Sequence, residues 1–280
     1  MQIDDLLLNT TIRIDTYNLK DGCMTDSSGG TAFFYGFNYN EKQNTSIICL
    51  VTNRHVVEGY SHGRFSIKTQ NDKGEYLLKE DYIFDLSDFD KKWIKHPNNK
   101  IDLCVLPLAP LFKEMEIKSK KPYFTMFTVN ETISHFEKQA LSNIEELYFI
   151  GYPDLIIDNL NNVPIVRRCI TATSIKKNYN GDPMFLIDAP VFGGSSGSPV
   201  LLFKNGPYLE GNAFVPGPKI KLVGIVSGAL KHKISDEITV KEVPAKVEVD
   251  EESFIQNNLG TVIDINELLK FDLLFSNWFA

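Results

Sequence analysis

The most informative stretch of the chain is Val191-Phe192-Gly193-Gly194-Ser195-Ser196-Gly197-Ser198-Pro199-Val200. Apolar runs at 185–187 and 200–203 flank it, so the spacing predicts a tight turn between two strands. Glycines this dense leave backbone N–H groups uncovered by side chains. A serine on such a turn therefore combines a hydroxyl nucleophile with N–H groups that can hold a developing oxyanion. Taken alone, the stretch also fits an ordinary hairpin loop with solubilising serines.

Composition limits the class of protein. The chain has 280 residues, enough to bury a large core, and its 19 Phe and 11 Tyr favour β structure. The net charge of −7 and the lack of clustered Lys and Arg argue against nucleic-acid binding. The N-terminus carries acids where a signal peptide needs bases, and no stretch approaches membrane-spanning length.

The cysteines indicate a reducing compartment. Cys23, Cys49, Cys104 and Cys169 are scattered, and they fit neither a disulfide framework nor a zinc pattern. We therefore expect a cytoplasmic protein with no membrane or nucleic-acid partner, no metal and no cofactor.

Short strands at even spacing dominate the rest of the chain, which predicts antiparallel barrels or a sandwich. The predicted strands include 11–17, 31–37, 45–51, 101–108, 146–153, 164–173, 199–203, 221–229 and 259–263. We expect a turn-rich connection at 23–30, a leading helix at 1–9, a helix at 130–143 and a charged, exposed excursion at 231–258. The spacing of Asp264 and Glu267 is that of a capping box, which predicts a closing helix at about 264–275.

Two further residues have contexts that suggest chemistry. His55 follows an apolar strand directly, where a side chain can point into a cleft; the alternative is an ordinary, partly buried histidine. Asp102 opens an otherwise apolar strand, and a lone buried carboxylate is costly unless something pairs with it. Asp102 therefore either caps the preceding turn or orients a histidine.

The order His55, Asp102, Ser196 resembles that of the trypsin/chymotrypsin superfamily of serine endopeptidases, in its bacterial, HtrA-like form. The segments that carry the resemblance are Thr52-Asn53-Arg54-His55-Val56-Val57, Ile101-Asp102-Leu103-Cys104-Val105-Leu106 and Gly194-Ser195-Ser196-Gly197-Ser198-Pro199. Lesser matches are Gly29-Gly30-Thr31-Ala32-Phe33, Ile150-Gly151-Tyr152-Pro153 and Gly224-Ile225-Val226-Ser227-Gly228. The likeness covers the chain from about residue 25 to the last helix, and we expect no appended PDZ domain.

The resemblance implies an all-β, chymotrypsin-like fold of two packed six-stranded antiparallel β-barrels with a C-terminal helix. The 280 residues would form one peptidase domain, with a first barrel at about 10–120, a second at about 145–265 and the closing helix at about 264–275. His55 and Asp102 would come from the first barrel and Ser196 from the second.

The resemblance also implies residue roles. Ser196 would be the nucleophile, His55 the general base and Asp102 the residue that orients it, while N–H groups of Gly194 and Ser196 would form the oxyanion hole. Ser227, Gly228 and Ala229 would offer a strand edge to an extended substrate. Pro190 and Val191, facing Ala229, would form the base of the specificity pocket; these positions carry no acid, so we expect cleavage after a neutral, apolar side chain.

Ser195 needs separate consideration, because Gly193-x-Ser195-x-Gly197 also fits the nucleophile elbow of α/β-hydrolases. That fold requires a helix after the serine and an acid and a histidine downstream. Here a strand is predicted at 199–203, and only His232 lies downstream. Ser195 stands where secreted trypsins carry the aspartate that pairs with a newly cut N-terminus, so we expect no activation of that kind. Ser198 replaces a glycine without affecting the nucleophile.

Two hypotheses about function follow. The first is a serine endopeptidase that performs limited proteolysis on protein or peptide substrates. One possible substrate is a dedicated partner effector. Its activity would be restrained by the segments 109–145 and 231–258. The second is a catalytically silent trypsin-like fold that binds a peptide or protein. Neither the sequence of the substrate nor the oligomeric state follows from these residues.

Overall fold

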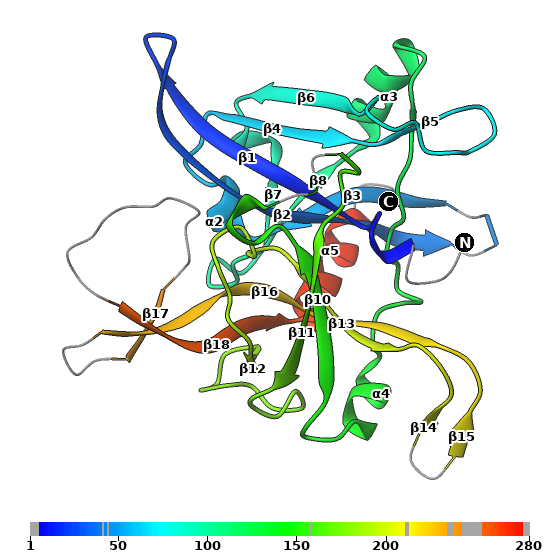
Figure 1. Ribbon diagram of the computed structural model, residues 1–280, viewed down its shortest axis with the longest axis vertical. Coiled ribbons are helices and arrows are strands. Elements are labelled where there is room, and N and C mark those ends of the chain that lie inside the picture. Colours follow the sequence, from blue (N-terminus) through cyan, green and yellow to red (C-terminus); the bar gives the residue numbers. More distant parts are fainter. Residues whose placement is uncertain are drawn as a thin grey trace.

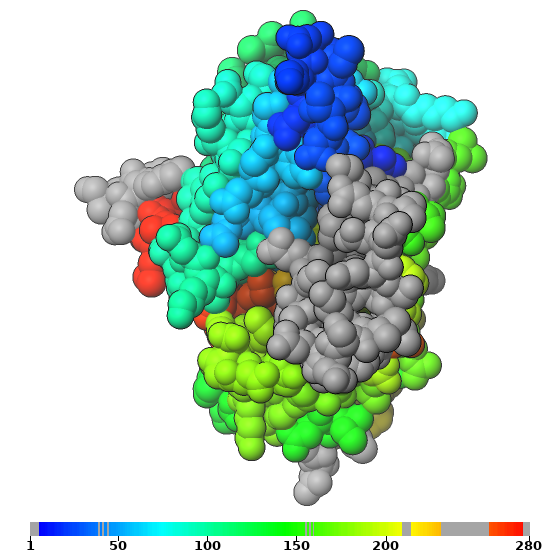
Figure 2. Space-filling model, turned by 90° about the vertical axis from the view of Figure 1, so that its left-hand side faces the viewer, coloured from blue at the N-terminus to red at the C-terminus, as the bar shows by residue number. Residues whose placement is uncertain are grey.

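The computed structural model describes residues 6–40, 42–43, 45–156, 158, 160–210, 213–233, 238–241 and 254–276. Two antiparallel β-sheets of seven strands each dominate this part of the chain, and one lies above the other in the view of Figure 1. The earlier strands form the upper sheet and the later ones the lower. Figure 2 shows the same division on one face, with blue and cyan residues above and yellow-green residues below.

The first sheet has the strand order β6-β4-β1-β2-β3-β8-β7. Its strands are β1 (Thr11–Lys20), β2 (Cys23–Asn40), β3 (Thr45–Thr52), β4 (His62–Ile67), β6 (Tyr82–Ser87), β7 (Ile94–Lys95) and β8 (Cys104–Pro107). A small additional pair joins β5 (Thr69–Gln70) to β9 (Lys121–Pro122).

The second sheet closes on itself. Its order is β13-β10-β11-β12-β18-β16-β17, and β13 also pairs with β16, so six strands form a closed antiparallel barrel with β17 added at one edge. The strands are β10 (Glu146–Gly151), β11 (Ile165–Thr171), β12 (Met184–Asp188), β13 (Pro199–Lys204), β16 (Lys219–Lys233), β17 (Ile238–Lys241) and β18 (Phe254–Asp264). A short hairpin of β14 (Tyr208–Glu210) and β15 (Ala213–Val215) projects from the barrel, at the lower right of Figure 1.

The expectation of two closed six-stranded barrels holds only for the second sheet. In the described part of the chain, β6 and β7 remain the two unpaired ends of the first sheet. A 3-10 turn, η1 (Asp90–Lys92), joins them, and β7 is only two residues long. The rings of Phe89 and Trp93, both buried, pack edge to face beside this turn, and the ring of Phe89 also packs over Gly63 of β4.

One hydrophobic core joins the two sheets. It combines Phe33 and Val51 of the first sheet with Phe149 and Val262 of the second. The closing helix α5 (Ile265–Ser276) contributes to the same core and contacts β2, β16 and β18. Phe275 of α5 packs against Phe37 of β2 with ring centroids 5.2 Å apart. The predicted closing helix is therefore present, and it connects the end of the chain to the first sheet.

Two local predictions differ from the structure. Residues 23–30 are not a turn-rich connection but the first half of β2, paired with β1. The turn lies earlier, at Asp21 and Gly22, both with positive φ, which is the backbone that an Asp-Gly hairpin prefers. The predicted helix at 130–143 is shorter: α4 (His135–Ala140) begins at a capping box made by Ser134 and Glu137.

The segment 109–145 is more regular than expected, because α3 (Ala109–Ile117) lies within it. The predicted helix at 1–9 lies partly outside the described residues; positions 6–7 are helical. Of the excursion at 231–258, residues 234–237 and 242–253 lie outside the described residues, and the remainder belongs mainly to β16, β17 and β18. No helix in the described part of the chain is long and apolar enough to cross a membrane.

Candidate active site

His55 lies on α2 (Arg54–Val57), a helix of only four residues at the end of β3. A helix this short does not form by its own propensity, so contacts with the rest of the protein must hold it. Val56 and Val57 are buried in the core of the first sheet. The guanidinium of Arg54 donates to the carbonyl of Asn99 at 2.8 Å, which ties α2 to the turn before Asp102.

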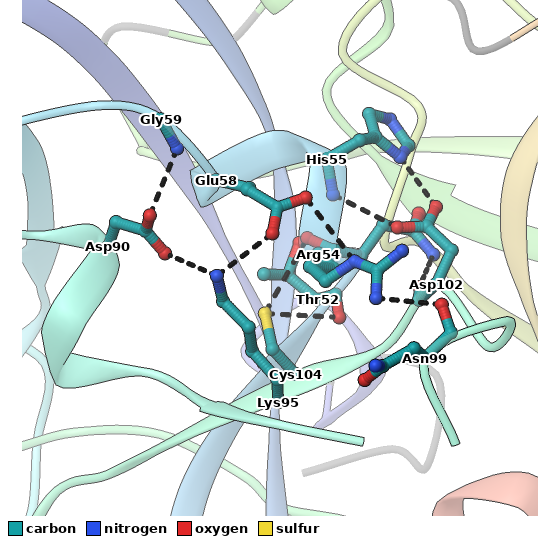
Figure 3. A network of polar contacts seen from close by, with 11 residues as sticks. Thr52, Arg54, His55, Glu58, Gly59, Asp90, Lys95, Asn99, Asp102 and Cys104 are labelled. Carbon is teal, nitrogen blue, oxygen red and sulfur yellow. Dashed lines mark hydrogen bonds and ion pairs between the residues drawn. The ribbon is translucent and has the colours of Figure 1, made fainter. Parts of the chain in front are cut away.

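Asp102 accepts two hydrogen bonds from His55 (Figure 3). Its Oδ2 lies 2.5 Å from Nδ1 of the imidazole, and its Oδ1 accepts from the backbone N–H of His55 at 2.9 Å. Asn53, the residue before α2, has no capping hydrogen bond from its own side chain. The carboxylate of Asp102 thus takes the place of a cap at the N-terminus of α2 while it orients the ring. Of the two readings of Asp102, the structure shows the one that involves a histidine.

Asn53 is a contributor that sequence reasoning missed. Its side-chain amide donates to the carbonyl of Asp102 at 2.8 Å, and the residue is fully buried. The contact holds the backbone of Asp102 at the same place where its side chain meets His55. The sequence shows that an asparagine lies in the Thr52–Val57 segment, but its contact with Asp102 depends on the fold and could not be predicted from the segment.

A charged network covers the outer side of α2 (Figure 3). Lys95 of β7 contacts Glu58 at 2.9 Å and Asp90 at 3.0 Å, and Asp90 accepts from the backbone N–H of Gly59 at 3.1 Å. Each of these half-exposed ion pairs contributes at most about 1 kcal/mol. Together they link α2 to η1 and β7, so the position of His55 depends on the first sheet as a whole.

The serine loop between β12 and β13 has a defined backbone. Gly194 and Gly197 have φ of 83° and 87°, which side chains with a Cβ rarely adopt. The N–H of Ser195 donates to Phe192 and that of Ser198 to Ser195, both at 3.1 Å. The N–H groups of Gly194 and Ser196 have no acceptor among the described residues. The loop therefore leaves two N–H groups unbonded in the described structure, at the two residues predicted to form the oxyanion hole.

The serine loop packs closely against β2 and against Thr52, which precedes α2. A Cβ on Gly197 would collide with the hydroxyl of Thr52. A Cβ on Gly30 of β2 would lie 2.7 Å from Val56 and 3.1 Å from the carbonyl oxygen of Ser196. Glycine at these two positions is thus what permits the serine loop to approach Thr52, and both Val56 and the serine loop to approach β2.

Ser196 is buried in this conformation. Both Ser195 and Ser196 are only 1% exposed, and neither hydroxyl has a hydrogen-bond partner among the described residues. By contrast, the side chains of His55 and Asp102 are 12% and 20% exposed. A buried hydroxyl without a partner lowers stability, and within the described part of the chain Ser195, Ser196 and Ser198 all contain one.

The residues expected to bind substrate lie on β16 and next to the serine loop. Ser227 lines a cavity of about 630 Å³ that also includes Asp102, Arg54 and Asp182. Beyond it, the strand edge is not open: Ala229 pairs with Lys241 of β17. Val226, Ser227 and Gly228 lie between the residues of β16 paired to β13 and those paired to β17, and Val226 exchanges hydrogen bonds with Gly197 and Ser198 of the serine loop. The expected edge at Ala229 is therefore already occupied by the chain itself.

Of the residues expected at the specificity pocket, Val191 and Ala229 are buried. A Cβ on Gly260 of β18 would come 2.5 Å from the side chain of Val191, so Val191 packs against the wall of the barrel. Pro190 is half-buried. The role of these three residues in specificity stays a prediction. In the described part of the chain, no three His, Cys, Asp or Glu residues lie close enough together to hold a metal ion.

The two sheets, the His55–Asp102 contact and the glycine-rich serine loop together define a β protein of the peptidase type. Residues 30–206, more than half of the chain, match the model of the trypsin-like peptidase domain family, and the chain belongs to that family. The resemblance seen in the sequence is thus confirmed. No curated protein sequence matches the chain. The strand β13 follows the serine loop directly, which is the arrangement expected here and not the helix that a nucleophile elbow requires.

Proposed function

We propose that the protein is a serine endopeptidase that performs limited proteolysis on protein substrates. The observation that carries the proposal is the pair of hydrogen bonds from His55 to Asp102, two residues that are far apart in the sequence. The bond at Nδ1 favours the tautomer whose proton sits on Nδ1 and whose lone pair sits on Nε2, the form that a general base needs. Membership of the peptidase family supports the same conclusion.

In the proposed mechanism, Oγ of Ser196 attacks the scissile carbonyl while Nε2 of His55 takes the hydroxyl proton. Asp102 stabilises the imidazolium that results. The N–H groups of Gly194 and Ser196 hold the oxyanion of the tetrahedral intermediate. His55 then gives its proton to the leaving amine, an acyl-enzyme remains on Ser196, and water attacks it with His55 again acting as base.

We further propose that the resting protein is restrained. Ser196 is 1% exposed, and the β16 edge beside it is occupied from Ala229 onward. A partner or substrate that displaces covering chain would admit the scissile bond. The segments 109–145 and 231–258 are where we place this control, and a dedicated partner effector is the class of substrate that fits it. A neutral, apolar side chain before the scissile bond and a cytoplasmic location complete the proposal.

Labelling with a fluorophosphonate tests the proposal. The wild-type protein should be labelled on one serine, Ser196→Ala should not be labelled, and the matched control Ser195→Ala should be labelled like the wild type. Labelling that survives Ser196→Ala and disappears in Ser195→Ala would contradict the choice of nucleophile.

A restrained peptidase and a silent binding module must also be separated. If folded wild-type protein is unlabelled, Ser196→Ala serves as bait for a partner, and the wild type is tested again with that partner added. Partner-dependent labelling supports a restrained peptidase. Binding without labelling or cleavage supports the catalytically silent module. A peptide-library profile dominated by Arg or Lys before the cleaved bond would contradict the expected neutral preference.

A further inference from the structure

We propose that Thr31 is a positioning residue for the reaction: it fixes the backbone on both sides of Ser196 and so holds the oxyanion hole in shape. The inference rests on the proposed peptidase function for its catalytic consequence, but its structural part stands apart from activity. Thr31 lies in β2, opposite Arg13 of β1, and is fully buried. It belongs to the first sheet, whereas the loop it contacts belongs to the second.

Thr31 uses all of its polar atoms in contacts with other segments. Its hydroxyl donates to the carbonyl of Gly194 at 2.9 Å and accepts from the N–H of Tyr152 at 3.1 Å. Its backbone N–H donates to the carbonyl of Ser196 at 2.8 Å. Its own carbonyl accepts from the hydroxyl of Thr52 at 2.7 Å. The side chain of Thr31 thus joins the serine loop to the end of β10, and its backbone carbonyl adds the strand that leads to His55.

These contacts have a direct effect on the serine loop. In a trans peptide the C=O and N–H point in opposite directions, so a hydrogen bond to the carbonyl also sets the direction of the N–H. Thr31 holds the carbonyls of Gly194 and Ser196, the residues on either side of Ser195. The two peptides that alternate with them are held as well: Gly193 accepts from Asp154 at 2.5 Å and Ser195 accepts from Ser198 at 3.1 Å.

Every carbonyl from Gly193 to Ser196 therefore accepts a hydrogen bond. The N–H of Gly194 shares its peptide with the carbonyl of Gly193, and the N–H of Ser196 shares its peptide with the carbonyl of Ser195. Each of these N–H groups points away from the group that bonds its carbonyl, and Thr31 holds the two peptides that alternate with theirs. Because neighbouring peptide planes share a Cα, a rotation of one plane moves the next. Release of the two carbonyls held by Thr31 would allow the oxyanion donors to turn. The hydroxyl is the part of this clamp that a side-chain substitution can remove, since the bond from the Thr31 N–H is made by backbone.

The surroundings also favour a single arrangement. A Cβ on Gly151 would collide with the hydroxyls of Thr31 and Ser198, and one on Gly197 would collide with the carbonyl of Thr31. The serine loop, the end of β10 and β2 are therefore in close contact around the Thr31 hydroxyl. A carbonyl and an N–H that lose the Thr31 hydroxyl cannot recruit water easily in such packing, so the backbone must move or leave them unsatisfied.

The test compares Thr31→Val, which has the same shape without the hydroxyl, with Thr31→Ser, which keeps the hydroxyl. We expect Thr31→Val to lower kcat by about 10- to 100-fold with KM changed less than about threefold, because the oxyanion forms only in the transition state. Thr31→Ser should keep kcat within about threefold of the wild type. A Thr31→Val enzyme with unchanged kcat, or a Thr31→Ser enzyme that is equally impaired, would overturn the proposal.

A readout without catalysis separates this proposal from the proposed function. Amide hydrogen exchange of the 191–200 segment should be faster in Thr31→Val than in wild type or Thr31→Ser, most of all at Ser195, Gly197 and Ser198, whose N–H groups are bonded. If exchange changes in this way but no protein is labelled by a fluorophosphonate, either alone or with a captured partner added, the clamp is correct and the peptidase function is wrong. Equal exchange in all three proteins contradicts the clamp. If Thr31→Val does not fold, Thr31→Ala, which cannot overpack the site, is measured in its place.

Discussion

Asp102 has two tasks that one carboxylate performs together. It accepts from the ring of His55 and from the backbone N–H that begins α2. An asparagine at position 102 has one acceptor oxygen in place of two, so it can accept from either the ring or the backbone N–H of His55 but not from both. Its NH₂ group would then face the other N–H group of His55. We expect Asp102→Asn to lower kcat by about 10³- to 10⁴-fold, because the tautomer of His55 would be reversed.

Steady-state kinetics on a peptide ester checks this prediction. The matched control is Asp88→Asn, since the side chain of Asp88 is 64% exposed and forms an ion pair with the nearby Lys91. The control should keep the wild-type kcat and stability. If Asp102→Asn retained more than a tenth of the activity, His55 would not depend on Asp102 as proposed.

Lys68 is a second residue with an unusual environment. It is 9% exposed, its Nζ donates to Asn9 at 2.8 Å, and burial lowers the pKa of its ammonium from 10.5 to about 8. Below pH 8 the ammonium is charged in both the folded and the unfolded protein, and its burial lowers the free energy of unfolding. This loss of stability becomes smaller as the pH rises from about 8 toward 10.5, because the folded protein then releases the proton while the unfolded protein keeps it.

We therefore expect Lys68→Met to raise the free energy of unfolding at pH 7 by about 2 kcal/mol. The difference between variant and wild type should fall as the pH approaches 10. Urea unfolding of both proteins at pH 7, 8.5 and 10 measures it. A difference that is constant over this range would show that the charge of Lys68 is not the cause.

At the scale of elements, β17 is the feature with the clearest functional consequence. It pairs with β16 from Ala229 to His232, and in the described part of the chain only Ser227 and Gly228 remain without a main-chain partner on this edge, since Val226 bonds to the serine loop. A substrate that binds by strand addition gains affinity from each main-chain pair it makes. For the wild type, peptides extended beyond two or three residues before the scissile bond should therefore gain less than about threefold in kcat/KM.

Proline substitutions in β17 test this idea, because proline cannot donate to a strand ladder. A Thr239→Pro/Val240→Pro double variant removes whichever of the two N–H groups points toward β16. We expect long peptides to gain about tenfold in kcat/KM in this variant, while a short ester substrate is unaffected. Equal gains for long and short substrates would point to a general change in the site and not to competition for the strand edge.

At the scale of the molecule, the two sheets are not independent units. Phe33, Val51, Phe149 and Val262 belong to one core, and α5 connects the end of the second sheet to the first. If one sheet unfolded alone, the apolar inner face of the other would be exposed to water. We therefore expect a single cooperative unfolding transition.

The cysteines report on this transition. Cys49 lies in the first sheet and Cys169 in the second; both are buried free thiols. Burial raises the pKa of Cys169 to about 12, and that of Cys49 is raised for the same reason, so both should be unreactive toward a thiol reagent in the folded protein. With increasing urea they should become reactive at the same midpoint. Different midpoints for Cys49 and Cys169 would show that the sheets unfold separately.

The sequence allowed much of this architecture to be predicted. Alternating apolar positions and turn residues located the main strands, and the Asp264-Ile265-Asn266-Glu267 segment located the last helix within one residue at either end. The error at 23–30 came from reading Gly29 and Gly30 as turn residues. Both belong to β2, and the lack of a side chain at Gly30 lets Val56 and the serine loop approach that strand. Local sequence pattern also does not predict whether a sheet closes into a barrel, because closure depends on whether the two edge strands, here β6 and β7, pair with each other in three dimensions.

By itself, the sequence determined the family of this protein and the residue types of its site, since His55, Asp102 and Ser196 each lie in a short segment whose local chemistry is distinctive. Tertiary structure alone decided how those segments meet. The contact of Asp102 with α2, the clamp of Thr31 on the serine loop and the occupation of Ala229 by β17 all join positions distant in the chain. Their energies come from burial and from hydrogen-bond geometry in three dimensions, which no local stretch of sequence contains.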